Sequence, residues 1–317
     1  MKNNLEIIID KEFYSLIDFV KGKSELELQD SILRNFTYVA NTSKPTFNSI
    51  ANFYNKIKLW GEINLENETY DLIINNAKTF ANNLDDIIWL YNNLEDFRSK
   101  KILTTILYYW FLLDYKKVNT IIDGFFPQYF DLDLVSCTSD EVFVDIGSYI
   151  GDTLVSYCKM FGINSYKNFY CYEISPENVN YINQNIERFN LEKVILRQKG
   201  ASNKEGTLFL SNNDASSTTQ LVENGTISVD LTTIDKDISE DVTFIKMDIE
   251  GGEKDALLGC LEKIRTSHPK LALSAYHNND HLFSLAKIIK EVDPSYKLYF
   301  RYYGGPLLPT EYILYAI

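Results

Sequence analysis

A glycine turn carries the first residues in the sequence that could do chemistry. The segment from Asp145 to Thr153 (Asp-Ile-Gly-Ser-Tyr-Ile-Gly-Asp-Thr) follows an apolar β-type run and opens a helical stretch. Its glycines let the backbone turn tightly, and the helix start offers free N–H groups. The spacing is neither that of a dinucleotide-binding turn nor that of a triphosphate loop. A carboxylate before the glycines suits a cofactor with a cationic amino group, such as S-adenosylmethionine, although an ordinary strand-to-helix turn is the alternative.

A second carboxylate, Glu173, strengthens this interpretation. It closes the next apolar run, 22 residues after Gly151. An acidic residue at this place can accept hydrogen bonds from both hydroxyls of a ribose. Because two carboxylates so placed are less expected by chance than one, we predict that the chain binds an adenosyl cofactor.

Alternating strands and helices must position these residues. From about Glu141 onwards, short β-rich runs alternate with helical stretches, which is typical of βαβ units and of a mostly parallel sheet. Ligands bind at the carboxyl ends of the strands in such sheets. We expect strands, including an inserted hairpin pair, at residues 142–146, 169–173, 194–198, 207–210, 226–231, 242–248, 271–277, 297–302 and 312–316. We expect helices at residues 153–161, 176–189, 254–265 and 282–291.

The first 130 residues differ from the rest in their glycine and proline content and in the spacing of their apolar residues. They contain only three glycines and two prolines, and apolar residues recur at helical spacing, as in Leu84, Ile87 and Tyr91. We therefore predict a mostly α-helical N-terminal domain at residues 1–130, followed by an α/β domain at residues 131–317.

Four segments of the α/β part resemble the FkbM family of S-adenosylmethionine-dependent methyltransferases. They are the turn from Asp145 to Thr153, Tyr172-Glu173, Phe244-Ile-Lys-Met-Asp-Ile-Glu-Gly-Gly-Glu253 and Ala275-Tyr-His277. The resemblance covers the chain from Gln128 to its C-terminus. It implies a class I methyltransferase fold, which has a Rossmann-like, mostly parallel sheet with helices on both faces. It also implies methylation of an oxygen on sugars, polyketides or other secondary metabolites.

The resemblance further implies which residues bind S-adenosylmethionine. The glycine turn would hold the methionyl part, Glu173 the ribose, and the segment after the third expected strand the adenine. Asp248, which follows Lys-Met in the most specific string, could position the acceptor hydroxyl or amine, or face the sulfonium. The cofactor-binding residues expected on this basis are Asp145, Gly147, Ser148, Gly151, Asp152, Thr153, Glu173, Gly200, Ala201, Ser202 and Asp248.

Methyl transfer also needs a group that removes the proton of the acceptor. His277 ends the strand expected next to that of Asp248, and the ordinary pKa of imidazole suits a general base. We expect both residues to be catalytic; a histidine bonded to a backbone carbonyl is the alternative. Lys246 points the same way as Asp248 and could simply pair with an acidic neighbour. Glu250 and Glu253 could position the acceptor or bond to N–H groups at the following helix start.

The acceptor site is the least defined part of the prediction. The expected acceptor-binding residues are Glu250, Tyr276, Asn278 and Arg301. Arg301 could hold a carboxylate or phosphate. Asp248, Glu250 and His277 could together ligate a divalent cation, but we do not predict a metal. Residues 211–219 could form a lid over the acceptor or a plain surface loop.

The composition narrows the range of partners. The chain has 317 residues, of which 31 are basic and 44 acidic, and its formal net charge is −13. Such an acidic chain is a poor candidate for binding nucleic acid, so we expect a small-molecule or glycan acceptor. The longest nearly apolar run is too short to span a bilayer, and no secretory signal is visible. Four scattered cysteines indicate reduced thiols, so we expect a cytoplasmic protein.

Three functions compete at this point. The leading one is methyl transfer to an oxygen, or else an amine, of a sugar, a glycan-linked group or another small metabolite. A nucleotide-dependent dehydrogenase would need the G-x-G-x-x-G turn that the chain lacks. A non-catalytic scaffold on a methyltransferase fold would be favoured by loss of the glycine turn or of Glu173, and both are present. The N-terminal domain could form homo-oligomers, recognise the acceptor or dock a partner of glycan biosynthesis.

Overall fold

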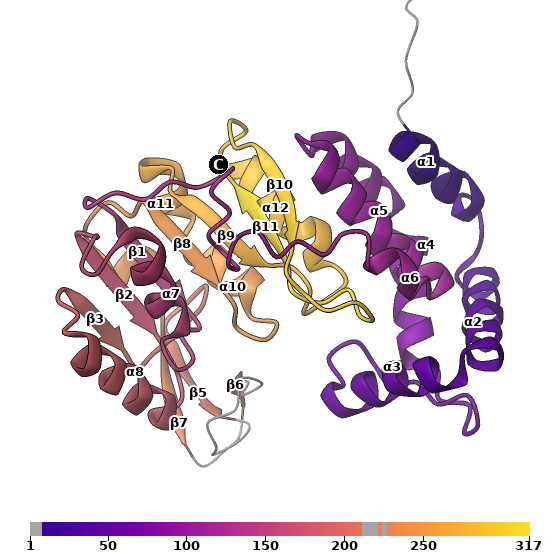
Figure 1. The fold of residues 1–317 in the computed structure, drawn as a ribbon, viewed down its shortest axis with the longest axis horizontal. Coiled ribbons are helices and arrows are strands. Elements are labelled where there is room, and N and C mark those ends of the chain that lie inside the picture. Colours follow the sequence, from indigo (N-terminus) through magenta and orange to yellow (C-terminus); the bar gives the residue numbers. More distant parts are fainter. Residues whose placement is uncertain (1–7, 211–220, 224–226) are drawn as a thin grey trace, which may run out of the picture. The chain divides into compact units, whose positions relative to one another are not determined.

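The computed structural model describes residues 8–210, 221–223 and 227–317. Its internal contacts divide the chain into two units, whose elements are labelled in Figure 1. The first unit comprises Met1–Gly124, Tyr276–Ser284 and Leu298–Tyr312. The second comprises Phe125–Ala275, Leu285–Lys297 and Ile313–Ile317. Two short segments of the C-terminal half therefore group with the N-terminal residues.

Helices make up the N-terminal part of the first unit, which confirms the predicted helical region. They are α1 (Ile8–Val20), α2 (Glu25–Thr42), α3 (Lys44–Ile57), α4 (Asp71–Asn93), α5 (Phe97–Leu112) and α6 (Tyr115–Val118). Helix α2 begins at a capping box, in which Ser24 and Glu27 each accept a hydrogen bond from the other's backbone N–H. Helix α4 bends at Asn83, whose φ and ψ are not helical. Helix α5 packs against α1, α2 and α4, and it buries Ile106 and Leu107 completely.

Strand β10 (Leu298–Tyr302) belongs to the first unit and lies against α5. The amide of Glu95 donates to the carbonyl oxygen of Leu298 at 3.1 Å, and the amide of Phe300 donates to Oγ of Ser99 at 2.8 Å. Ser99 in turn donates its own amide to the N-cap residue of α5, Asp96. The start of α5 therefore satisfies backbone groups of β10 as well as its own.

A mostly parallel sheet forms the core of the second unit, as predicted. Its strands are β1 (Val142–Ile146), β2 (Asn168–Tyr172), β3 (Val194–Arg197), β8 (Phe244–Met247), β9 (Lys270–Ser274) and β11 (Tyr312–Ala316). They lie in the order β11-β9-β8-β1-β2-β3, and β11 runs antiparallel to β9 while the other pairs are parallel. All five residues of β1 are buried, which explains why the sequence of this central strand is an almost continuous apolar run.

Helices alternate with these strands along the chain (Figure 1). They are α7 (Asp152–Phe161), α8 (Pro176–Phe189), α9 (Ile234–Asp237), α10 (Glu253–Leu258), α11 (Leu261–Ser267) and α12 (His281–Val292). The predicted start of α8 is confirmed, because the side chain of Ser175 accepts a hydrogen bond from the amide of Asn178.

The single helix predicted at residues 254–265 is wrong. The structure has two helices there, and they separate at Gly259 and Cys260. A methyl group on Gly259 would overlap the carbonyl oxygen of Ser202, and the carbonyl of Gly259 accepts a hydrogen bond from Asp235 at 3.0 Å. These tertiary contacts hold Gly259 in a conformation that interrupts the helix, and the local sequence pattern does not report them.

A second, smaller sheet lies in the same unit. Its strands are β4 (Gly200–Ala201), β5 (Gly206–Leu210), β6 (Leu221–Val222) and β7 (Ser228–Thr232), in the order β4-β7-β5-β6. Strands β5 and β7 pair antiparallel, which confirms the inserted hairpin. Residues 211–219, for which a lid and a plain surface loop were the alternatives, lie outside the described residues.

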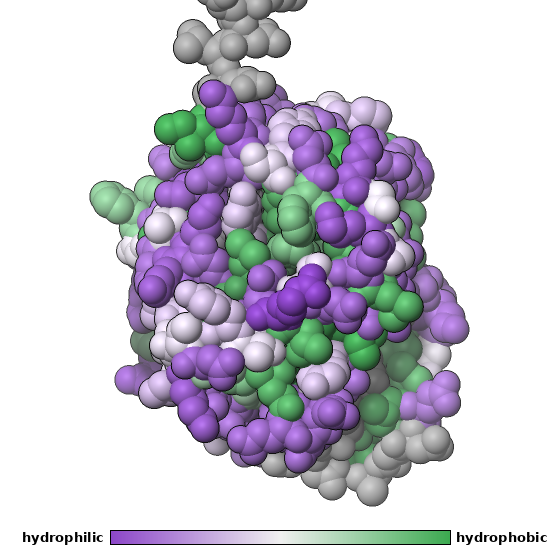
Figure 2. All heavy atoms as spheres, turned by 90° about the vertical axis from the view of Figure 1, so that its right-hand side faces the viewer, coloured by the Kyte–Doolittle hydropathy of each residue, from purple (hydrophilic) through white to green (hydrophobic). Residues whose placement is uncertain are grey.

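Among the residues that the structure describes, apolar ones on the surface do not gather into one large patch on the face drawn in Figure 2. On the face drawn in Figure 2, polar residues surround separate small patches of apolar ones. Within residues 8–210, 221–223 and 227–317, no helix combines the length and the apolar character that a membrane span needs.

Candidate functional site

The glycine turn is fixed by its contacts with the two strands beside β1. Gly147 has a φ of +81°, and a methyl group on it would overlap the carbonyl oxygen of Asp248. The amides of Gly147 and Ser148 both donate to the carbonyl of Tyr172 at 3.0 Å. Gly151 also has a positive φ of +81° and is the N-cap of α7. The turn therefore needs glycine at these two positions and lies directly on the ends of β2 and β8.

A buried ion pair joins the end of β1 to β8. Nζ of Lys246 lies 2.9 Å from a carboxylate oxygen of Asp145, and both side chains are almost completely buried. Lys246 also donates to the carbonyl of Gly147 at 2.6 Å. Burial opposes the charge of Lys246, but the carboxylates of Asp145, Asp248 and Asp152 outweigh it and raise the pKa of the lysine. Lys246 thus pairs with an acidic neighbour, as one of the predictions had it, and it links Asp145 to the backbone of the glycine turn.

Glu173 is tied to the turn by its own carboxylate. One oxygen accepts from the amide of Tyr149 at 2.8 Å, and the other accepts from the amide of Ser175 at 2.8 Å and from the side chain of Asn178 at 3.3 Å. Burial raises the pKa of Glu173, although these hydrogen bonds oppose the rise. The residue predicted to hold the ribose therefore also holds the backbone of the glycine turn.

The segment predicted to contact adenine forms part of the smaller sheet. Gly200 and Ala201 are buried in β4 and pair with β7, and the amide of Ser202 donates to the carbonyl of Thr232 at 2.9 Å. Gly259 touches the backbone of Ser202. The position of this segment is thus set by two elements that are distant from it in the sequence.

Asp248 follows β8 and is half-buried. One of its carboxylate oxygens accepts a hydrogen bond from the hydroxyl of Tyr129 at 2.7 Å. The ring of Tyr129 also lies 5.1 Å from Nζ of Lys246, measured to the ring centroid. Tyr129 has a positive φ of +71° and receives a hydrogen bond from the side chain of Gln128. The segment before β1 therefore covers the end of β8.

The two glutamates after Asp248 differ in what the structure shows of them. Glu253, the first residue of α10, is completely buried and accepts from the amides of Ile249 at 2.8 Å and Gly251 at 3.1 Å. This confirms the prediction that it bonds to N–H groups near the following helix start. Glu250 is half-buried with a positive φ of +55°, and its expected contact with the acceptor stays a prediction.

These residues meet at the point where the order of the strands reverses. From β1 the chain continues to β2 and β3 on one side, and then crosses to β8 and β9 on the other. Ile146 and Met247 are partners in the β1–β8 register, so Gly147 and Asp248 follow paired residues. Ligands of doubly wound sheets bind at such a switch point. The structure thus brings together Asp145, Gly147, Ser148, Glu173 and Asp248.

The candidate base His277 lies in the first unit, beyond the strand in which it was predicted. Strand β9 ends at Ser274, so the predicted strand to residue 277 is too long by three residues. His277 is 1% exposed, and its ring centroid lies 4.2 Å from that of Tyr276. The hydroxyl of Tyr276 donates to Glu311 at 3.1 Å. Asn278 lies 3.4 Å from a ring nitrogen of His281.

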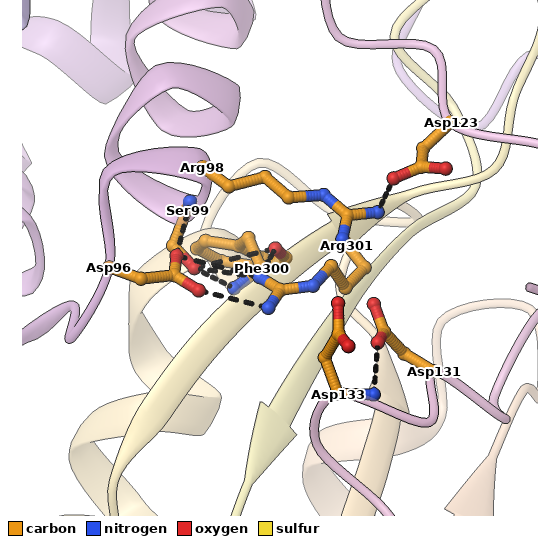
Figure 3. A network of polar contacts seen from close by, with 8 residues as sticks. All are labelled: Asp96, Arg98, Ser99, Asp123, Asp131, Asp133, Phe300 and Arg301. Atoms are coloured by element: carbon orange, nitrogen blue, oxygen red, sulfur yellow. Dashed lines mark hydrogen bonds and ion pairs between the residues drawn. The ribbon is translucent and has the colours of Figure 1, made fainter. Parts of the chain in front are cut away.

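Arg301, expected to bind an anionic group of the acceptor, is buried against the start of α5. Its guanidinium lies 2.9 Å from the carboxylate of Asp96 and donates to the carbonyl of Phe300 at 2.8 Å. Figure 3 shows these contacts, together with the ion pair between Arg98 and Asp123. Burial alone would raise the pKa of Asp96, but hydrogen bonds from Ser99 and the ion pair with Arg301 lower it. The expected role of Arg301 toward an acceptor stays a prediction.

Two side-chain contacts at these sites were not deduced from the sequence. Tyr129 bonds to Asp248, and Trp60 bonds to the carbonyl of Tyr276 at 2.6 Å. Both partners lie more than 100 residues away along the chain. The only local signal for Tyr129 is its position just before the first expected strand, and no local signal marks Trp60.

The sheet order, the glycine turn at the switch point and the acidic residues that follow β2 and β8 define a class I methyltransferase fold. Residues 145–297 match the family model described as the methyltransferase FkbM domain. The resemblance predicted from the sequence is confirmed for this part of the chain. No curated protein matches the sequence.

Comparison with solved structures found several that are similar to this chain. The methyltransferase FkbM from Methylobacillus flagellatus is 24% identical with a TM-score of 0.66, and the match covers 76% of this chain and 60% of that one. An rRNA methylase from Streptococcus thermophilus is 11% identical, with a TM-score of 0.36 and coverage of 57% and 87%. Fibrillarin from Aeropyrum pernix, solved with S-adenosyl-L-methionine bound, is 9% identical, with a TM-score of 0.37 and coverage of 58% and 70%. This chain thus spans less than two thirds of the first of these structures.

Proposed function

We propose that this protein is an S-adenosylmethionine-dependent methyltransferase that acts on an oxygen of a sugar, a glycan-linked group or another small metabolite. An amine is the alternative acceptor atom. The observation that supports the proposal is the arrangement at the switch point, where the turn at Gly147, the carboxylate of Glu173 and the carboxylate of Asp248 are held together.

The residues of this arrangement fit the cofactor in charge and hydrogen-bonding capacity. Asp145 is buried and paired with Lys246, whereas Asp248 is only half-buried, so we assign the cationic methionyl end to Asp248. The carboxylate of Glu173 has about four lone-pair sites and accepts three protein hydrogen bonds, which leaves capacity for a ribose hydroxyl. Asp152 and Thr153 begin α7, whose first N–H groups suit the methionyl carboxylate.

The remaining residues are assigned to adenine and to the acceptor. Gly200, Ala201 and Ser202 would contact the adenine. The bound cofactor supplies an electrophilic methyl group, and the protein has to orient the acceptor and take its proton. We assign the removal of the acceptor's proton to His277, which lies three positions after the last residue of β9. Glu250, Tyr276, Asn278 and Arg301 would hold the acceptor.

The rest of the proposal concerns partners and location. The net charge of −13 favours a small-molecule or glycan acceptor over nucleic acid. The free thiols of Cys137, Cys158, Cys171 and Cys260 suit a cytoplasmic location. Residues 1–130 would act as a domain that recognises the acceptor, forms a homo-oligomer or docks a partner of glycan biosynthesis.

Glu173→Gln should weaken the binding of S-adenosylhomocysteine at least about tenfold, because an amide group would turn a donor toward the N–H groups that Glu173 accepts from. Isothermal titration calorimetry of the purified variant measures this. Glu187→Gln, which changes an exposed glutamate of α8 in the same way, should bind like the wild type. Unchanged affinity in a folded Glu173→Gln protein would contradict the ribose role.

His277→Ala should slow turnover of the acceptor by about 100-fold or more, because a positioned base contributes roughly 10²–10⁴-fold to the rate. The affinity for S-adenosylhomocysteine should stay within about twofold of the wild type. Release of S-adenosylhomocysteine during turnover is the measurement. His268→Ala, at an exposed histidine after α11, is the control. Full activity of the His277 variant would rule out its role as the base.

The first test of the proposed function is calorimetric titration with S-adenosylmethionine and S-adenosylhomocysteine, with and without Mg²⁺, and with NAD⁺ as the negative control. Micromolar binding of an adenosyl ligand supports the proposal and justifies a screen of acceptors that begins with sugars. No binding of either ligand would leave the scaffold function as the better explanation.

A further inference from the structure

The segment Tyr276–Ser284 carries His277 and is held by the N-terminal helices within the first unit. The indole Nε1 of Trp60 donates to the carbonyl of Tyr276 at 2.6 Å. Three residues later, the side chain of Asn279 donates to Asn76 at 3.1 Å and to Thr79 at 3.2 Å, both on α4. The residues on both sides of His277 are therefore fixed by side chains that come from the first 80 positions of the chain.

Trp60 is itself well anchored. Its ring stacks on Phe53 with a centroid distance of 5.9 Å, and it meets Tyr54 edge to face at 5.6 Å. The carbonyl of Trp60 accepts from the side chain of Asn75 at 3.0 Å. The next residue, Gly61, has a φ of +99°, and a methyl group on it would touch the first residue of α4 at 2.8 Å. These contacts fix the turn that carries Trp60, and so they fix the position of the indole N–H donor.

The hydrogen bond from Trp60 is made to Tyr276, whose ring lies against the ring of the buried His277. Tyr276 is 7% exposed, and its carbonyl accepts the hydrogen bond of the indole within this buried surrounding. Its hydroxyl is held at the other end by Glu311, and its ring packs against the ring of His277. A shift of the Tyr276 backbone would therefore displace the imidazole as well.

We propose that Trp60 is a positioning residue, which fixes the segment Tyr276–Ser284 and with it the imidazole of His277. The inference rests on the proposed function in one respect, namely the role of His277 as the base. It assigns to the N-terminal helices a part in acceptor chemistry, because a proton acceptor that moves by about 1 Å loses much of its effect on the rate.

Trp60→Phe and Trp89→Phe form a matched pair of variants. Phenylalanine at position 60 keeps an aromatic ring against Phe53 and removes only the N–H donor. Trp89 is a half-buried residue of α4, and its indole N–H makes no hydrogen bond within the part of the chain that the structure describes. The chain has three histidines, so ¹⁵N-histidine spectra resolve His277 and His281 in the segment and His268 outside it.

Trp60→Phe should shift the imidazole signals of His277 and His281 and leave those of His268 in place. Amides of residues 276–284 should exchange with deuterium about tenfold faster, because one hydrogen bond that holds them is lost. Trp89→Phe should match the wild type in both measurements. Calorimetry should give Trp60→Phe an affinity for S-adenosylhomocysteine within about twofold of the wild type.

Wild-type signals and exchange in Trp60→Phe would overturn the proposal, and so would equal changes in Trp89→Phe. Faster exchange throughout the chain would also overturn it, because Trp60 would then support the whole fold. Asn279→Ala, which removes the second anchor, should reproduce the change in the histidine signals. If the wild type fails to bind S-adenosylhomocysteine, the proposed function fails, while the histidine spectra still decide the role of Trp60.

Discussion

Gly147→Ala is expected to destabilise the protein by about 2–5 kcal/mol and to abolish measurable binding of S-adenosylhomocysteine. A positive φ of +81° costs alanine about 1–2 kcal/mol. The added methyl group would also overlap the carbonyl oxygen of Asp248, so the turn or the end of β8 has to move, at a further cost of about 1–3 kcal/mol. Urea denaturation measures the stability, and calorimetry measures the binding.

Gly206→Ala provides the control for this prediction. Gly206 lies in β5 without a positive φ, and a methyl group on it would meet no atom within 4 Å. Its effect on stability should stay within about 0.5 kcal/mol, and its binding should be that of the wild type. A Gly147→Ala protein with wild-type stability and affinity would show that the turn does not lie against Asp248 as described.

Lys246→Met is expected to lower the free energy of unfolding by about 3–5 kcal/mol at pH 8, because it leaves the carboxylate of Asp145 buried without its counter-ion. The double variant Lys246→Met/Asp145→Asn should recover part of the loss, because the amide carries no charge. Lys236→Met removes an exposed ion pair with Glu205 and should cost at most about 1 kcal/mol. Equal effects of the two lysine substitutions would contradict the importance of burial.

The pH dependence gives this prediction a second readout. Burial, opposed by Lys246, raises the pKa of Asp145 to about 6, against an ordinary value of about 3.9. Because the folded state then binds this proton more tightly than the unfolded state, the contribution to stability is lost as pH rises from about 4 to about 6. Without Lys246 the pKa of Asp145 rises further. The stability difference between the wild type and Lys246→Met should therefore be larger at pH 8 than at pH 5.

Elements were predicted well where the local sequence determines their type and their ends. Strand β1 is a buried run bounded by the glycine turn, and α8 has both its N-cap Ser175 and its first-turn Pro176 in the sequence. The mostly parallel sheet and the position of the glycine turn at a strand end follow from the alternation of strands and helices. The errors lie where distant segments decide the conformation, as at Gly259, which is held against Ser202.

The candidate site could be predicted by residue type, but most of its contacts could not. The carboxylates of Asp145 and Glu173 were identified from their spacing, yet the sequence could not show that Lys246 and the amide of Tyr149 already engage them. The contact between Tyr129 and Asp248 was not deduced, because the two residues lie 119 positions apart in the chain. Side chains that join elements distant in the chain leave no periodic pattern, so only the folded structure reveals them.

The two C-terminal segments that group with the helices limit how this chain can change by recombination. A crossover that exchanged residues 1–124 for an unrelated domain would remove the donor of the Tyr276 carbonyl and the acceptor of the Phe300 amide. Buried groups left without partners cost about 1–3 kcal/mol each. An exchange of the helical part therefore has to replace residues 276–284 and 298–312 together with residues 1–124.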